Sequence, residues 1–391
     1  MDIRRVKLNE ILFFSALMCY CAHYFIDGSL IESKIPAILK VLKAVILALL
    51  FFKWMIAERY NKKKTAVWGI FLIAVFMVSI TGKYKGILLS MCLVISGQDI
   101  EFDKIVKVLL TNTLAWSAVI VLLCKAGFLP DYTFVHQLGA SSTIGHSYGF
   151  RYYSWIGYIA MAVTMMWIYL RKKAGLLELL ILAVMNYLLY KVHTTNLSFY
   201  ITLMFMLAYY CVEKLKIVRF QGRFWKFLAT ILPFSLCGVT MAAVIAYGKG
   251  IFSVSVSWMN TIVGRLEYSV EALQRYGIHL FATRVEQLGN TAMIYEGAET
   301  AFYIDSGYVY SIIAYGIFFT LISLTLYTLL FRHLYYMKER ILYLWIATLL
   351  FASIINNFVY DIINNPVLFL IPAAVFGNRR KLKAGGKTCA Q

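Results

Sequence analysis

The charged residues that could act on a phosphate ester gather in one polar stretch, residues 249–305, inside an otherwise apolar chain. Arg265 and Arg284 are candidates for binding phosphate, because a planar guanidinium can donate two parallel hydrogen bonds to phosphate oxygens. Glu267 and Glu286 each follow one of these arginines by two positions, where a carboxylate could orient a hydroxyl or accept its proton. The same spacing fits an ion-pair network that only folds the stretch, and spacing alone does not separate the two interpretations.

Further polar candidates lie within this stretch and in an earlier one. The long stretch also contains His279 and ends at Asp305, and residues 145–151 (GHSYGFR) contain His146 and Arg151. The earlier segment immediately precedes an apolar run, which places its polar side chains at the depth of lipid head groups. Its glycines would let the backbone approach a ligand closely. A single histidine is more often structural than catalytic, so both roles stay open for His146.

The pattern over residues 261–277 predicts a helix within the long stretch. Glu271 and Arg275 stand four positions apart with the acid first, which is the favourable order for a surface ion pair. Arg265 has Ser269, not an acid, four positions ahead of it. We therefore interpret Arg275 as half of a surface pair, whereas Arg265 has no such partner on its own helix.

The composition predicts an integral membrane protein. Hydrophobic residues make up 61% of the 391 residues and charged residues only 15%, whereas a soluble domain is nearer half apolar and a quarter charged. Many apolar runs approach the length of a membrane-spanning helix. These runs are continuous and do not alternate with polar residues, which argues against a β-barrel and favours helices as the spanning elements.

About twelve apolar segments are predicted to span the membrane, so the predicted fold class is all-α and polytopic. We expect a single membrane domain over residues 1–391, with a large extracytoplasmic loop at residues 248–306 before the late spans. No internal repeat is visible in the sequence. The predicted spans are approximately residues 10–26, 36–56, 65–80, 86–97, 105–128, 155–170, 176–190, 197–212, 227–247, 308–331, 341–358 and 366–376.

The distribution of charge predicts the orientation of the chain. Lys and Arg number 38 against 19 Asp and Glu, which gives a formal net charge of +19. Most basic residues fall in the termini and in alternate loops, as the positive-inside rule requires when both termini are cytoplasmic. The long loop holds more acidic than basic residues. The excess charge therefore orients the chain and meets anionic lipid heads, and we expect no nucleic acid partner.

The seven cysteines indicate neither a metal site nor a disulfide framework. None of them lies in the long loop, and none shows the spacing of metal ligands. The sequence also lacks an ATP-binding P-loop motif. We therefore expect no metal and no cofactor.

Three stretches of the chain resemble the Wzy-type polymerases, which join repeat units of O-antigen, capsule and exopolysaccharide. They are residues 145–151, residues 260–265 (NTIVGR) and residues 304–308 (IDSGY). These are similar to the family's glycine-histidine loop, its N-x-x-x-G-R segment and its D-N-G-Y entry to a late span. The chain departs from the family at residues 194–196 (TTN), where an arginine-containing triplet is common, and at residues 152–153 (YY), where proline and asparagine are usual.

The resemblance implies a membrane glycosyltransferase of the GT-C type in the bacterial cytoplasmic (inner) membrane. The implied substrate is an oligosaccharide repeat unit on undecaprenyl diphosphate, which makes a nucleotide sugar unnecessary. A chain-length regulator and a flippase are the implied partners. The candidate catalytic groups are then Glu267, Glu286, His146, His279 and Asp305, and the candidate diphosphate ligands are Arg265, Arg284 and Arg151.

Two other classes of membrane protein compete with this interpretation. An O-antigen ligase has a similar topology and would transfer finished polymer to a different acceptor. A flippase or other transporter would not be an enzyme, and transporters typically bury charged residues near the membrane midplane between related halves. The products distinguish the enzymes, since loss of a polymerase leaves single repeats and loss of a ligase leaves lipid-linked polymer.

Overall fold

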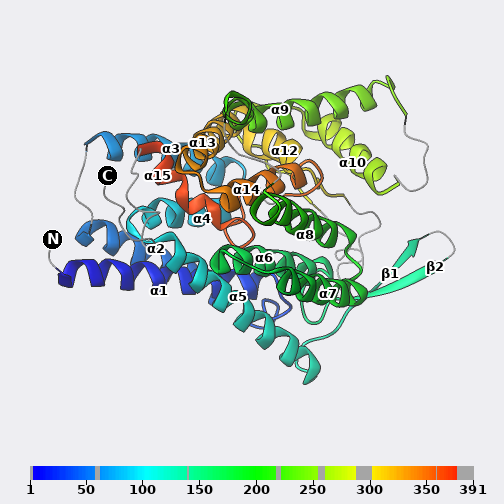
Figure 1. Ribbon diagram of the computed structural model, residues 1–391, viewed down its shortest axis with the longest axis horizontal. Coiled ribbons are helices and arrows are strands. Elements are labelled where there is room, and N and C mark those ends of the chain that lie inside the picture. The colour runs from blue at the N-terminus through cyan, green and yellow to red at the C-terminus, as the bar shows by residue number, and fades with distance from the viewer. Residues whose placement is uncertain are drawn as a thin grey trace. The chain divides into compact units, whose positions relative to one another are not determined.

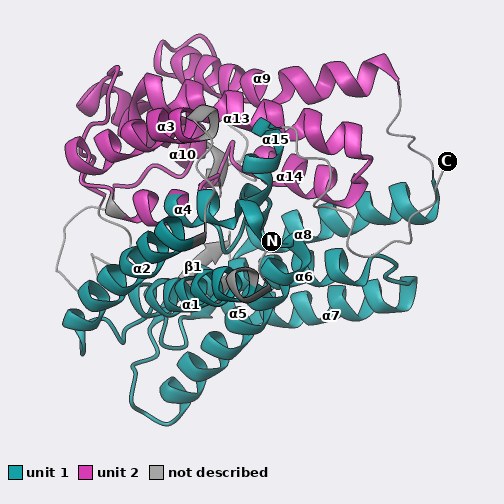
Figure 2. Cartoon of the chain, turned by 90° about the vertical axis from the view of Figure 1, so that its left-hand side faces the viewer, with its two compact units in different colours: residues 1–60, 92–219, 362–391 teal, residues 61–91, 220–361 magenta. Residues whose placement is uncertain are grey.

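A computed structural model describes residues 3–57, 62–138, 141–216, 222–253, 260–287, 302–357 and 359–376, and these residues form a nearly all-α protein (Figure 1). The chain divides into two compact units (Figure 2). Unit 1 contains Met1–Tyr60, Cys92–Arg219 and Ile362–Gln391, and unit 2 contains Asn61–Met91 and Phe220–Asp361. Each unit is therefore built from segments that are distant in the sequence, and the single domain expected over residues 1–391 stays a prediction.

Helices form most of unit 1. α1 and α2 pack against each other and are joined by a short turn. α5 packs against both α1 and α6, and α7 and α8 pack against α6. A single π-helical turn, Tyr210–Lys214, continues α8, and a 3-10 turn, Pro366–Leu370, precedes the last helix. The helices are α1 (Ile3–Asp27), α2 (Pro36–Ala57), α5 (Phe102–Lys125), α6 (Ser154–Arg171), α7 (Leu176–His193), α8 (Asn196–Tyr209) and α15 (Ile371–Phe376).

Unit 2 is built around a long interrupted helix, which packs against α9, α3 and α14. This helix consists of α12, a π-helical turn at Ser311–Tyr315, and α13. The elements are α3 (Lys62–Thr81), α9 (Arg223–Gly248), α10 (Asn260–Tyr276), α12 (Gly307–Tyr310), α13 (Gly316–Met337) and α14 (Arg340–Ala352). α4 (Lys85–Ser96) carries the chain from unit 2 into unit 1.

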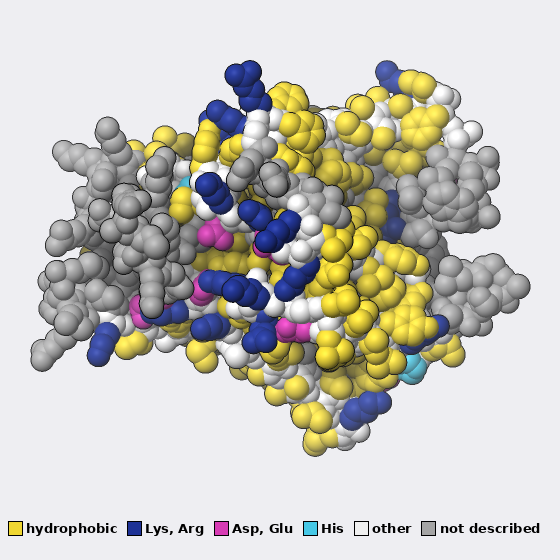
Figure 3. Space-filling model, in the orientation of Figure 1, with side chains coloured by type: hydrophobic (Ala, Val, Ile, Leu, Met, Phe, Trp, Pro, Cys, Tyr) yellow, Lys and Arg dark blue, Asp and Glu magenta, His cyan; other side chains and the backbone are white. Residues whose placement is uncertain are grey.

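Each predicted span overlaps helical structure, and among the described residues five helices are long and apolar enough to cross a membrane. The five are Lys7–Asp27, Phe102–Lys125, Leu176–His193, Arg223–Gly248 and Gly307–Met337. The exposure of α7 is typical of a helix that faces lipid. Its apolar side chains are mostly exposed, and its buried residues are Leu179, Asn186 and His193. Hydrophobic side chains likewise cover large areas of the face drawn in Figure 3. Such exposure is costly in water but normal against lipid, and the chain is accordingly a multi-pass membrane protein.

A β-hairpin corrects the purely α-helical expectation. β1 (Thr133–Leu138) pairs with β2 (Ser141–His146) in antiparallel register, from Thr133 opposite His146 to Leu138 opposite Ser141. β-branched residues in both segments, and Phe134 in β1, favour strands. The predicted span at 341–358 also needs correction, since α14 ends at Ala352 and the chain then turns through residues 353–357.

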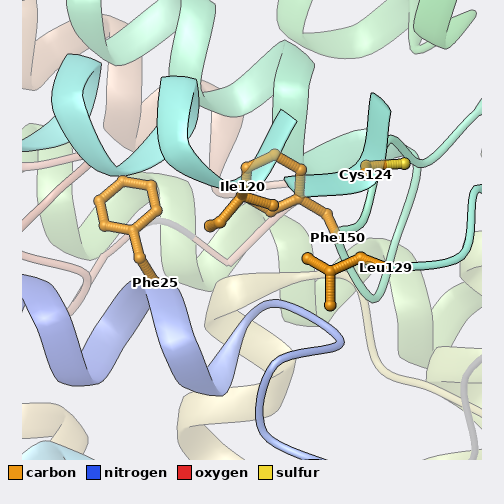
Figure 4. Close-up of a cluster of buried hydrophobic side chains, with 5 residues drawn as sticks. All are labelled: Phe25, Ile120, Cys124, Leu129 and Phe150. Carbon is orange, nitrogen blue, oxygen red and sulfur yellow. The ribbon is translucent and has the colours of Figure 1, made fainter. Parts of the chain in front are cut away.

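A small hydrophobic cluster positions the loop after the hairpin in unit 1. Phe150 packs with Phe25, Ile120, Cys124 and Leu129, so the loop is fastened to α1 and α5 (Figure 4). The preceding glycine, Gly149, has φ of 84°, and a Cβ there would lie 3.1–3.3 Å from three of these side chains. A glycine is therefore required at this turn. This packing fixes the position of the neighbouring residue, Arg151.

Candidate functional site

The helix predicted over residues 261–277 is confirmed as α10. The small residues Ser269 and Ala272 of this helix are buried, and the helix packs against α9. The predicted surface pair is also confirmed, because the Arg275 guanidinium contacts the Glu271 carboxylate. The Arg275 guanidinium lies 4.8 Å from the centre of the Phe302 ring as well, so Arg275 fastens α10 to the segment that leads into α12.

Arg265 and Asp305 form the most enclosed of the ion pairs that involve the candidate residues. The Arg265 Nε donates to the Asp305 Oδ2 over 2.7 Å, and the two side chains are only 21% and 28% exposed. Ser269, four positions after Arg265, donates its hydroxyl to the Arg265 carbonyl over 2.7 Å and leaves the guanidinium to Asp305. Asp305, one of the candidate catalytic residues, therefore contacts an arginine that it can orient.

The residues after Asp305 hold its position. Ser306 caps α12 by accepting a hydrogen bond from the Val309 amide. Gly307 donates its amide to the Ser353 carbonyl over 2.9 Å, and a Cβ at Gly307 would lie 3.0 Å from a carbonyl oxygen of the same turn. Tyr308 donates its hydroxyl to the Leu350 carbonyl over 2.9 Å. The DSGY sequence therefore has mainly a scaffolding role after its first residue, which is the one left to pair with Arg265.

The environment of Asp305 affects its protonation. Burial raises the pKa of Asp305 above its ordinary value, because the charged form loses solvation. The adjacent Arg265 guanidinium opposes this rise by stabilising the carboxylate. The arginine therefore favours the charged form of the carboxylate, and the carboxylate in turn fixes the direction of the guanidinium.

Half-buried aromatic residues lie beside this pair. The rings of Tyr268 and Tyr303 are 4.8 Å apart, and Tyr268 and Tyr276 each contact the buried Phe302 ring at 6.5 and 6.0 Å. Tyr268 comes from α10, one turn after Arg265, and Tyr303 comes from the segment that ends in Asp305. Such rings offer apolar faces of the kind that pack against sugar rings.

Arg284 and Glu286 form a second, much more exposed pair. The Arg284 Nη2 lies 3.3 Å from the Glu286 Oε1, and the side chains are 55% and 69% exposed. Tyr276, the last residue of α10, accepts a hydrogen bond from the Glu286 amide over 3.2 Å. Tyr84 accepts one from the Val285 amide over 2.8 Å and donates to the Thr283 carbonyl over 3.2 Å. Burial raises the pKa of Tyr84, because the charged phenolate would lose solvation.

Glu267 and His279 occupy separate exposed positions. The Tyr247 hydroxyl lies 3.4 Å from the Glu267 carboxylate, which does not pair with Arg265 as its spacing had suggested. The Nε2 of His279 lies 2.7 Å from the Tyr276 carbonyl. Because a carbonyl oxygen can only accept, Nε2 carries a proton and Nδ1 is the basic nitrogen when the ring is neutral.

In unit 1, His146 is paired with a residue that sequence reasoning missed. The His146 Nδ1 lies 2.8 Å from the Asp131 Oδ2, and the other Asp131 oxygen accepts from the Tyr148 amide over 2.8 Å. This arrangement closes the base of the hairpin. His193, the last residue of α7, is buried and accepts from the Thr195 amide over 2.9 Å, so this histidine has a structural role.

Arg151 joins two loops of unit 1 by an ion pair and a backbone hydrogen bond. Its guanidinium lies 2.6 Å from the Glu32 carboxylate, and its amide donates to the Gly28 carbonyl over 3.0 Å. Glu32 also escaped sequence reasoning, because it lies more than a hundred residues before its partner. Both contacts join the loop after the hairpin to the turn after α1.

Six of the eight candidate residues lie in four pairs, and each candidate arginine holds a carboxylate. The pairs are Arg265 with Asp305, Arg284 with Glu286, Arg151 with Glu32, and His146 with Asp131. No family model matches the chain, and searches of curated proteins and of solved structures return no match either. What the arrangement can do chemically therefore has to be argued from these contacts alone.

Proposed function

We propose that the chain is a membrane polymerase that joins undecaprenyl-diphosphate-linked oligosaccharide repeat units into a capsular, O-antigen or exopolysaccharide chain. The proposed topology has about twelve spans and a GT-C-like fold, with both termini in the cytoplasm and the long loop on the outer face of the bacterial cytoplasmic membrane. The observation that carries the proposal is the enclosed Arg265–Asp305 pair beside Tyr268 and Tyr303.

In the proposed reaction, a hydroxyl of the incoming unit attacks the anomeric carbon of the growing chain. The bond between that carbon and the diphosphate oxygen breaks, and the lipid diphosphate leaves with the electron pair. A guanidinium held in advance by a carboxylate is suited to the charge that develops on the departing diphosphate, because it needs little reorganisation. Arg265 fits this role best, since it is the least exposed of the three candidate arginines.

The proton of the attacking hydroxyl passes to a base, for which Glu267, Glu286, His146 and His279 are the candidates. Glu286 and His279 both lie on the segment that follows α10, and both contact Tyr276, its last residue. Arg284 is exposed at the same end, where it could bind the diphosphate of an incoming unit. In this assignment Arg265 binds the diphosphate of the growing chain and Arg284 that of the incoming unit. The two arginines are separated because Arg265 lies in the first half of α10, whereas the Arg284 segment contacts the C-terminal end of this helix.

The proposal is tested by deleting the gene and separating the surface polysaccharide on a gel beside the complemented strain. We expect single repeats to replace the ladder. Full-length polymer retained on its lipid would favour an O-antigen ligase instead. Repeats trapped on the inner leaflet would favour a flippase or other transporter.

A further inference from the structure

The candidate span Gly307–Met337 is interrupted near one end. α12 gives way to the π-helical turn Ser311–Tyr315, and α13 starts only at Gly316, whose φ is 84°. An interruption of this kind removes backbone hydrogen bonds within the helix, and other groups must replace them in a membrane.

The segment that follows α10 provides these replacements. The Ile317 and Phe318 amides donate to the His279 and Leu280 carbonyls over 3.0 and 3.1 Å. The Thr283 amide then donates to the Ala314 carbonyl over 3.1 Å. Residues 279–283 therefore run alongside the span as far as Phe318 and return toward Ala314, which describes a turn.

A close backbone approach fixes the turn to the interruption. A Cβ at Gly316 would lie 2.5 Å from the Phe281 carbonyl carbon and 2.8 Å from the Leu280 oxygen. Only glycine leaves room for the turn at this point. The tight fit and the three backbone hydrogen bonds indicate that the turn and the interruption form a single built feature.

The length of the span indicates how deep the turn lies. The span has 31 residues, and at about 1.5 Å per residue it is about 46 Å long, against a hydrocarbon core of about 30 Å. A centred span would extend about 8 Å beyond the core at each end. Gly316 follows Gly307 by about 14 Å of helix axis. In a centred span the turn would therefore reach about 6 Å into the hydrocarbon, a depth typical of interfacial insertion.

The side chains at the turn suit this depth. Leu280 is 57% and Phe281 49% exposed. The Phe281 ring lies 6.2 Å from the ring of Phe318, which is itself exposed on α13 together with Leu321. The patch made by Leu280, Phe281, Phe318 and Leu321 is thus continuous with the exposed apolar face of a candidate membrane span, whereas the polar backbone of the turn faces the helix.

We propose that residues 279–283 form a re-entrant turn that inserts Leu280 and Phe281 among the acyl chains of the surrounding bilayer. The polar side chains next to the turn, including Arg284, are then held at the level of the lipid head groups. This inference concerns the membrane contact of the loop and does not depend on which reaction the protein catalyses.

Site-directed spin labelling of the full chain in phosphatidylcholine–phosphatidylglycerol vesicles tests the proposal. Phe281→Cys is labelled and its collision rates with oxygen and with a water-soluble nickel chelate are compared. Leu321→Cys provides the matched lipid-facing control, and Lys249→Cys, exposed just after α9, provides the aqueous control. The six cysteines in the described ranges are buried or half-buried, and the signal of the labelled wild-type chain is subtracted.

At Phe281 we expect the ratio of the two collision rates to shift clearly toward oxygen from the value at Lys249, but by less than at Leu321, which lies about 8 Å further along the helix axis. A ratio equal to that at Lys249 would place the turn in water and overturn the proposal. Low accessibility to both reagents would also overturn it, because protein and not lipid would then cover the turn. Leu280→Cys provides the same measurement if Phe281→Cys does not fold.

Discussion

The Arg265–Asp305 pair of unit 2 and the Arg151–Glu32 pair of unit 1 join the same kinds of side chain, but water reaches them to different degrees. The Arg265 side chain is 21% exposed and that of Arg151 is 48% exposed. Burial perturbs the pKa of Asp305, whereas Arg151 and its backbone fasten two surface loops. An enclosed, oriented charge can act on a developing charge more strongly than a solvated one, and for this reason the proposed reaction uses the pair in unit 2.

The largest expected effect comes from removing the enclosed guanidinium. In the deletion strain, Arg265→Ala should lower polymer yield by about 100-fold or more, the usual cost of losing a preorganised charge donor at a transition state. Polymer per unit of membrane-inserted protein is the measurement. Arg265→Lys keeps the charge but loses the fork geometry, and we expect it to recover only part of the yield. An unchanged ladder with Arg265→Ala would exclude a role in diphosphate binding.

A smaller loss is expected when the partner of Arg265 is made neutral. Asp305→Asn retains the shape of the side chain but no longer holds the guanidinium by charge, so polymer yield should fall by about tenfold through misorientation. Glu32→Gln is the matched change in unit 1 and should leave the yield nearly unaltered. Equal losses from both variants would remove the distinction between the two pairs.

The two pairs should also differ in how their contribution to stability depends on pH. Arg265→Gln should lower the free energy of unfolding by about 2 kcal/mol at neutral pH, between the values for exposed and buried pairs. Asp305 is then left charged without its partner, and its pKa, already raised by burial, rises further. The deficit should therefore shrink as the pH falls through that raised pKa and Asp305 takes up a proton.

The thermal midpoint of the detergent-solubilised protein, followed from pH 7 downward, measures this dependence. Arg151→Gln is the control, because the more exposed Arg151–Glu32 pair should contribute no more than about 1 kcal/mol. A deficit for Arg265→Gln that grows toward acid would contradict the assigned pKa direction for Asp305.

The smallest effect is expected on activity from the exposed arginine of unit 1. Arg151→Ala should change polymer yield by less than about threefold, because a solvated surface pair contributes little and the cluster around Phe150 still holds the loop. The gel used for Arg265→Ala provides the comparison. A loss as large as that of Arg265→Ala would show that Arg151 also acts on the substrate. The Arg151–Glu32 pair would then share the function proposed for the Arg265–Asp305 pair.

Local patterns in the sequence predicted most of the helices. Hydropathy is a property of contiguous residues, so the predicted spans coincide with helices, and α10 was recognised from its spacing together with the Glu271–Arg275 pair. The β-hairpin was missed because its segments are short, polar-rich and attached to an otherwise helical chain. The end of α14 was missed because hydropathy alone does not mark a turn.

The contacts between distant residues could not be predicted. Tyr84 and Val285 are 201 positions apart, and Arg265 and Asp305 are 40 positions apart. No spacing rule connects such residues, because the folded helices bring them together. The sequence did identify Arg265, Arg284 and Asp305 as chemically capable groups. It could not show which of them are buried, because burial depends on tertiary packing.

The most direct test of the central claim reverses the enclosed pair. The double variant Arg265→Asp with Asp305→Arg retains an ion pair at this position but moves the guanidinium to the other side of the contact. Expressed in the deletion strain, it should reach the membrane and yield single repeats on the gel, because the charge no longer points at the substrate. A restored polymer ladder would contradict the account, since the pair would then be needed only to hold the loop together.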